Sequence, residues 1–126
     1  MLGRGMVFAS VAVSDLEQGK EFYGDTLGLE TAPSGDPGGL LYSCGGGSRL
    51  LVYKSSYAGT NQATSAGWEV SDIASEIAEL NAKGIDFERY EMPGVARDGD
   101  VHLVGNIKAA WFKDPDGNIL SVIERV

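Results

Sequence analysis

The sequence predicts an α+β fold made of two βαβββ modules, and three observations support it. Val70–Ile73 repeats the pattern of Val13–Leu16 at an offset of 57 residues, and each copy precedes a helical pattern. Each helical pattern ends at a glycine, Gly28 in the first copy and Gly84 in the second. Each copy also finishes with two apolar runs joined by a turn-rich segment. A repeat of this length sets the architecture, here two modules that together curve around a cup, with the helices on the outer face.

The first module has an interpretable element at every step. Residues 7–13 are small and apolar and predict a buried strand. Ser14 and Glu17 fit a capping box that begins a helix over 15–27, and Gly28 suits its left-handed end. The remaining strands are expected over 29–32, 40–44 and 49–54, with a loop over 33–39 and a glycine-rich turn over 45–48.

The second module repeats this order after a polar connector over 55–64. Ile73, Ile77 and Leu80 share one face of the second helix. A strand is expected over 85–91, followed by a long loop over 92–105. The module closes with a hairpin over 106–125, because Asp-Pro-Asp-Gly-Asn at 114–118 combines a fixed φ, two side chains that bond nearby amides and a permissive glycine.

Length and composition indicate one domain, 1–126, with module one at about 1–58 and module two at about 59–126. The net charge of −8 argues against nucleic acid as a partner; it favours cationic ligands or simply reflects solubility. Cys44 is the only cysteine, which fits a reducing cytoplasm and excludes an intramolecular disulfide. No apolar stretch approaches the roughly 20 residues of a membrane span, so we expect no membrane partner.

Two motifs resemble the vicinal oxygen chelate superfamily, the glyoxalase/bleomycin-resistance/dioxygenase group. One is Val11–Leu16 together with Phe22–Leu29, and the other is Phe112–Asn118. The resemblance covers essentially the whole chain and implies the two-module fold. It says little about activity, because the superfamily mixes enzymes with binding proteins.

The resemblance also locates the positions that hold metal in other members. There, four strand positions facing the cup carry His, Glu or Gln, and a divalent ion chelates neighbouring substrate oxygens. Counting along the sequence from the repeated motifs places these positions at Phe8, Leu51, Ser65 and Ser121. None of these side chains is a ligand that zinc or a harder divalent ion prefers. His102, the only histidine, falls in the expected 92–105 loop outside these positions, so we predict no metal, no cofactor and no catalytic residue.

Strand alternation extends this prediction to a ligand-binding lining. Phe8, Tyr53 and Trp111 are expected to stack against a planar ligand, with Glu69 available to a cation and Arg49 to an anion. In the alternative, Arg49 and Glu69 pair with each other and the aromatic rings fill a collapsed core. Trp68 and Phe112 have the opposite phase and are expected to pack against the helices. The complete predicted set is Phe8, Ser10, Arg49, Leu51, Tyr53, Ser65, Glu69, Trp111 and Ser121.

Three functions follow from this reading. The first is a metal-free binding protein resembling the bleomycin-resistance branch, a homodimer that sequesters an aromatic or cationic small molecule. The second is a lyase, isomerase or dioxygenase-like enzyme with a non-standard site built on Glu69, Tyr53 or His102. The third is a structural or regulatory partner that uses its sheet edges for assembly.

Overall fold

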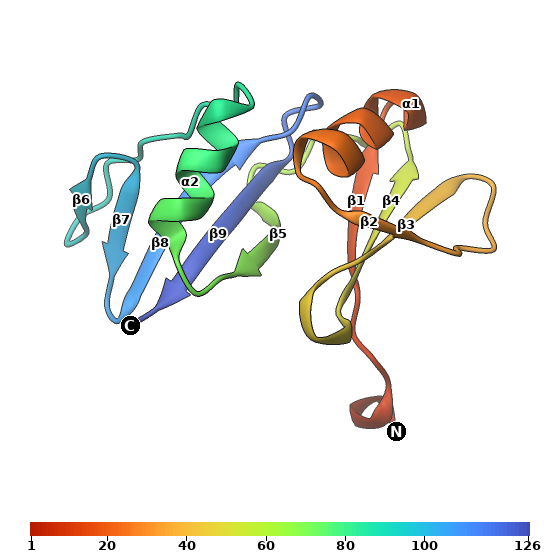
Figure 1. Cartoon of the computed structure of the whole chain (residues 1–126), viewed down its shortest axis with the longest axis horizontal. Helices are drawn as coiled ribbons and strands as arrows, with labels where there is room; N and C mark the ends of the chain where they lie inside the picture. Colours follow the sequence, from red (N-terminus) through yellow and green to blue (C-terminus); the bar gives the residue numbers. More distant parts are fainter.

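The computed structural model describes residues 1–126 and has two mixed sheets, side by side (Figure 1). The four-stranded sheet has the order β1-β4-β3-β2 and the five-stranded sheet the order β5-β9-β8-β7-β6. β1 and β5 are neighbours, while α1 contacts β4 and α2 contacts β9. The two-module α+β prediction is therefore confirmed, with one more strand in module two. The elements are β1 (Ala9–Val13), α1 (Leu16–Gly19), β2 (Glu30–Ala32), β3 (Gly39–Ser43), β4 (Arg49–Lys54), β5 (Thr64–Glu69), α2 (Ile73–Ala82), β6 (Ala96–Asp98), β7 (Val101–Val104), β8 (Ile107–Lys113) and β9 (Ile119–Arg125).

One hydrophobic core joins the two modules. Alternate residues of β1, β4, β8 and β9 are buried in it, as period-two strand patterns require. The rings of Phe22 and Phe112, one from each module, lie 6.4 Å apart between centroids. Phe112 is buried and Trp68 packs against this core, as their strand phase predicts. We call the sheet faces turned away from this core the cup faces.

The repeated Ser-Asp pair begins both helices, but aspartate is the capping residue. Asp15 accepts from the backbone N–H groups of Glu17 and Gln18, and Asp72 accepts from that of Ser75. The predicted capping box on Ser14 is wrong, because its hydroxyl donates to Asp116 instead.

The first helix is shorter than predicted and changes type. After the four residues of α1, Lys20–Thr26 forms π-helical turns, in which hydrogen bonds span one residue more than in an α-helix. Leu27 N–H accordingly donates to the carbonyl of Phe22 (2.8 Å). Gly28 then takes a φ of +72° and ends the helical segment, as predicted.

Two expectations for module two are corrected. Residues 85–91 form no strand of their own, and their only β-bridge to the sheet joins Glu88 to Trp111. The expected loop over 92–105 contains β6 and β7, which pair as a hairpin. Gly105-Asn106 lies between the apolar ends of β7 and β8, a dipeptide that is typical of hairpin turns and signals this strand pair.

The turn at 114–118 connects the β8–β9 hairpin and also fastens module two to module one. Asp116 accepts from the backbone N–H and the hydroxyl of Ser14. Asn118 Nδ2 donates to the carbonyl of Ala12 (2.7 Å), and Asn118 Oδ1 accepts from Gly59 N–H (3.2 Å). These bonds span up to 106 residues of sequence, so a local turn motif sets a long-range contact.

A buried carboxylate organises the same turn from inside. Asp114 Oδ1 accepts from the N–H groups of Asp116 and Asn118, while Asp114 Oδ2 accepts from the Tyr23 hydroxyl (2.7 Å) and from Asn118 Nδ2 (2.8 Å). Burial, and then the negative charge of Asp114, raise the pKa of Tyr23 far above its ordinary value. Tyr23 therefore stays protonated and acts as a permanent donor to Asp114.

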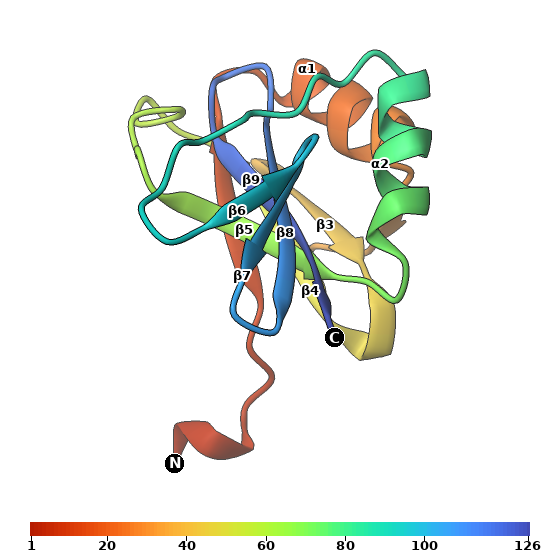
Figure 2. The same cartoon turned by 90° about the vertical axis from the view of Figure 1, so that its left-hand side faces the viewer.

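The N-terminal arm, residues 1–8, extends away from both sheets (Figures 1 and 2). It contains a short 3₁₀ turn over Leu2–Arg4, and β1 begins only at Ala9, two residues later than predicted. The arm carries an unusual number of exposed apolar side chains, namely Met1, Leu2, Met6, Val7 and Phe8. Elsewhere, neither helix has the length and apolar character that crossing a membrane requires.

Candidate functional site

The cup face of module one is a row of side chains across β1, β4 and β3. Ser10 is the ladder partner of Leu51, and Leu51 is also the partner of Leu41. Tyr53 lies opposite Ala12 on the same face and is 37% exposed. Their strand neighbours Val11 and Val52 are buried in the core, so the row points away from it. The structure thus brings Ser10, Leu51 and Tyr53 together on one surface.

The cup face of module two is a second row, across β5, β9 and β8. Ser121 is the ladder partner of both Gly67 and Trp111. A Cβ at position 67 would displace the Ser121 hydroxyl, so the glycine lets this hydroxyl pack closely against β5. Ser121 is only 8% exposed, which makes it part of the floor of this surface.

The end of β5 departs from the predicted frame. A bulge between Thr64 and Ala66 leaves Ser65 without a ladder partner, and Thr64 lies opposite Ile119 instead. The hydroxyl of Thr64 accepts from Trp111 Nε1 (3.2 Å). Thr64 is thus a cup-face residue that sequence alternation missed, because a bulge shifts the phase by one residue.

Trp111 belongs to an aromatic cluster with Tyr90 and His102. The ring centroids lie 4.9 Å apart for His102 and Trp111, and 5.5 Å apart for Tyr90 and Trp111, both with edge-to-face geometry. His102 is fully buried on β7, not in a loop as predicted. Its Nε2 accepts from Tyr90 N–H (2.9 Å), and its Nδ1 lies 3.3 Å from the carbonyl of Ala109. Both ring nitrogens are therefore engaged within the protein.

The environment of Tyr90 favours its neutral form. Burial and the nearby carboxylate of Glu88 raise the pKa of the Tyr90 phenol, and Lys113 opposes them. Tyr90 and His102 were missed as neighbours of Trp111. The turn residues Gly105-Asn106 indicate the β7–β8 hairpin, in which His102 is the ladder partner of Ala109. Ala109 lies two residues before Trp111 and shares its face of β8, so this turn is the signal that could have placed His102 near Trp111.

Phe8 is the last residue of the N-terminal arm, and Arg49 is the first residue of β4. Together with Met6 and Val7 they line a cavity of about 210 Å³. Phe8 precedes β1 and is 55% exposed, so a strand does not fix its direction. The bulge takes Ser65 out of its predicted frame, and the other eight predicted residues fall into three groups: Ser10, Leu51 and Tyr53; Glu69, Trp111 and Ser121; and Phe8 with Arg49.

The two predicted charges do not pair with each other. Glu69 accepts from Arg125 Nε (2.8 Å), and both side chains are more than half exposed. Arg49 is exposed and takes part in none of the five ion pairs of the chain. The alternative in which Arg49 and Glu69 neutralise each other is therefore wrong, and Arg49 stays available to an anion.

The residues present do not fit a catalytic metal ion. Phe8 and Leu51 offer no donor atom, and Ser65 and Ser121 offer only neutral hydroxyls. No group of three or more His, Cys, Asp or Glu side chains is placed to share an ion anywhere in the chain. The cup faces instead combine aromatic, aliphatic and hydroxyl side chains, which suit contact with an organic molecule.

Comparison with known proteins places this fold in a family. A profile of the glyoxalase/bleomycin resistance protein/dioxygenase superfamily matches residues 5–122. None of the curated proteins matches the chain. Among solved structures, TnmS3, an antibiotic binding protein from Streptomyces sp. CB03234, superposes with a TM-score of 0.73 at 22% identity, covering 100% of this chain and 99% of its own.

Two further structures show the same likeness. A glyoxalase family protein from Bacillus anthracis has a TM-score of 0.70 at 22% identity, over 98% of this chain and 96% of its own. A glyoxalase/bleomycin resistance protein from Streptomyces sp. CB03234 has a TM-score of 0.66 at 22% identity, over 94% and 98%. At these identities the likeness establishes the fold. With two repeated modules and a profile match over nearly its whole length, the chain belongs to the glyoxalase/bleomycin resistance protein/dioxygenase superfamily.

Proposed function

We propose that this protein is a metal-independent binding protein that sequesters an aromatic or cationic small molecule on its cup faces. The observation that carries this proposal is the replacement of every family metal position by a side chain that cannot act as a strong ligand. The aromatic cluster around Trp111 lies beside one of these positions, Ser121, which is its ladder partner. The indole ring of Trp111 would stack against a planar ligand bound at this place.

The superfamily supports a binding role in general. TnmS3, whose fold this chain shares, is described as an antibiotic binding protein. An enzyme with a non-standard site would need a free acid or base on the cup faces. Of the three candidates, Glu69 is paired with Arg125 and His102 is buried with both nitrogens engaged, which leaves only the Tyr53 phenol without such a contact. These contacts favour sequestration over turnover.

We also propose that the protein works as a homodimer. The cup-face rows of the two modules lie on separate sheets, and the exposed apolar arm projects beyond them. Five of the eight arm residues are large, apolar and exposed, and burying them against a second copy of the chain would stabilise a dimer. Sedimentation velocity on the full chain and on Phe8→Asp tests this: the full chain should sediment as a dimer and the variant should dissociate more readily.

The binding proposal is tested by fluorescence titration. In a Trp68→Phe background, Trp111 is the sole tryptophan and reports on the cup face. A planar aromatic cation such as proflavine should quench it saturably, and Tyr53→Ala or Leu51→Ala should weaken binding by about tenfold through lost contact. Tyr57→Ala, at an exposed site in the connector, is the matched control and should leave binding unchanged. Absence of saturable quenching, or a stoichiometric metal ion in protein purified without chelator, would contradict the proposal.

A further inference from the structure

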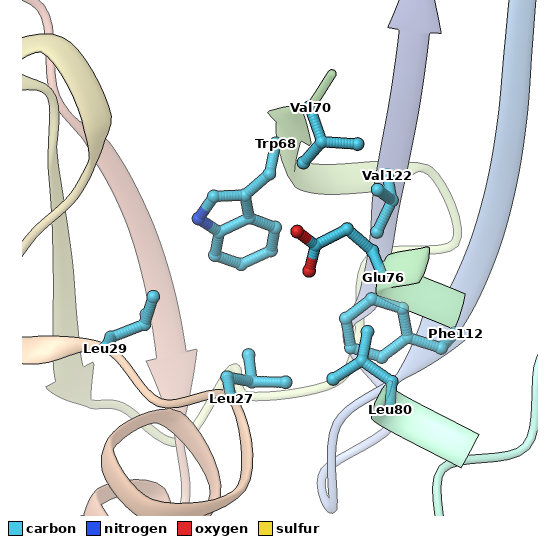
Figure 3. A pocket seen from close by; sticks show the side chains of 8 residues that line it. All are labelled: Leu27, Leu29, Trp68, Val70, Glu76, Leu80, Phe112 and Val122. Atoms are coloured by element: carbon cyan, nitrogen blue, oxygen red, sulfur yellow. The ribbon is translucent and has the colours of Figure 1, made fainter. Parts of the chain in front are cut away.

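A second cavity lies on the helix side of the sheets, where the two modules meet (Figure 3). Its volume is about 200 Å³, and seven of its eight lining residues are apolar. Leu27 and Leu29 come from module one, while Trp68, Phe112 and Leu80 come from β5, β8 and α2 of module two. The Trp68 and Trp111 side chains lie on opposite sides of the same sheet, so this cavity is separate from the cup faces.

The wall contributed by module one depends on a single glycine. Gly28 has a φ of +72°, a left-handed conformation that side chains other than glycine rarely adopt. The resulting reversal brings both Leu27 and Leu29 to the cavity wall, as Figure 3 shows. The module-one wall of the cavity therefore follows from how the helical segment ends.

One charged group lines this apolar cavity. Glu76 lies in the first turn of α2, and in Figure 3 its carboxylate points into the space beside Trp68 and Phe112. The five ion pairs of the chain use other carboxylates, and no basic residue is among the lining side chains. Glu76 is partly buried, and both its carboxylate and the neighbouring aromatic rings attract a positive charge placed in this cavity.

We propose that this cavity is a second binding site, specific for a small organic cation that carries one aromatic ring on an amine. An apolar cavity of roughly 150 Å³ accommodates a benzene ring. The space between Leu27, Leu80 and Phe112 thus suits one ring, with the ammonium group between Glu76 and Trp68. The net charge of −8 assists the approach of such a cation. This inference does not depend on the cup-face proposal.

The test uses a matched pair of probes. In a Trp111→Phe background, Trp68 is the sole tryptophan, and benzylamine and benzyl alcohol are titrated at neutral pH. Benzylamine, which is protonated there, should bind about tenfold more tightly than the uncharged alcohol because it gains the carboxylate and the ring faces. Equal affinity of the two probes, or no saturable change in Trp68 emission, would overturn the proposal.

The variants assign the preference to one residue. Glu76→Gln should remove the advantage of benzylamine and change the affinity for benzyl alcohol by less than about twofold. Glu79→Gln makes the same charge change on an exposed position of the same helix and should leave both affinities unchanged. An equal loss in both variants would show a general charge effect and refute the site. In a Trp68→Phe background, Glu76→Gln should leave the proflavine quenching of Trp111 unchanged, which separates this cavity from the cup faces.

Discussion

At the residue scale, two tyrosines show how one buried group differs from another. Tyr23 and Tyr42 are both completely buried. The Tyr23 hydroxyl donates to Asp114, whereas the Tyr42 hydroxyl has no hydrogen-bond partner. Burial raises the pKa of both phenols, and the carboxylates Asp114 and Asp25 add to the effect for Tyr23 and Tyr42 respectively. The same side chain therefore stabilises the fold at one position and carries an uncompensated polar atom at the other.

The two corresponding phenylalanine variants should differ in their effects on the free energy of unfolding. Tyr23→Phe leaves the buried Asp114 without one of its donors and should lower the free energy of unfolding by about 1–3 kcal/mol. Tyr42→Phe removes an unsatisfied hydroxyl and should leave that free energy unchanged or raise it by about 1 kcal/mol. Urea denaturation followed by circular dichroism measures both. A comparable loss in the two variants would show that the Tyr42 hydroxyl has a partner.

At the scale of elements, the sequence predicts the strands and turns that short local patterns specify. The β8–β9 hairpin follows from its turn residues, and β4 has the predicted bounds Arg49–Lys54. The division between core and cup face follows from alternation, except at Ser65, where a bulge interrupts it. Two features have weak local signals: the π-helical turns after Gly19, and the irregular segment at 85–91, whose only β-bridge joins Glu88 to Trp111.

The cup-face rows follow from strand phase, but the neighbours of Trp111 do not. Tyr90 reaches it from a segment outside any strand, and His102 through the β7–β8 pairing. The pairing of Glu69 with Arg125 across β5 and β9 depends on tertiary distance, which spacing in sequence does not encode. Alternation thus predicts which face a side chain occupies, and it leaves open which side chains from other elements cover it.

The contact between the 55–63 connector and the 114–118 turn gives a sharp test of close packing. Gly59 has a φ of +70°, and a Cβ there would collide with the carbonyl oxygen of Asp116. Gly59→Ala should therefore cost about 2–4 kcal/mol, from the left-handed conformation plus displacement of the turn. Gly35→Ala is the matched control, because Gly35 also has a φ of +70° but open space around it. It should cost about 1 kcal/mol, and equal losses in thermal or urea unfolding would contradict the contact.

At the scale of the whole molecule, the buried phenols should make stability depend on alkaline pH. An unfolded tyrosine titrates near pH 10. Tyr23 and Tyr42 keep their protons to higher pH in the folded state, since their pKa values are raised. Above about pH 10 the unfolded chain binds fewer protons than the folded one, so stability falls as pH rises. Below about pH 9 both states are protonated, and this contribution is fully present and constant.

The expected slope is up to about 1.4 kcal/mol per pH unit for each of these two tyrosines. Urea unfolding measured between about pH 8 and pH 11 should show it. The double variant Tyr23→Phe/Tyr42→Phe should lose most of this slope relative to the parent protein. A double variant with the parent's alkaline slope would assign the effect to other groups.

The turn at 114–118 also has a consequence for the order in which the chain acquires structure. Its bonds to Ala12, Ser14 and Gly59 connect the last eighth of the chain to the first half. During synthesis the first module emerges long before these donors and acceptors exist. We expect it to remain loosely structured until the final hairpin closes, so that both halves reach the native state in one cooperative step.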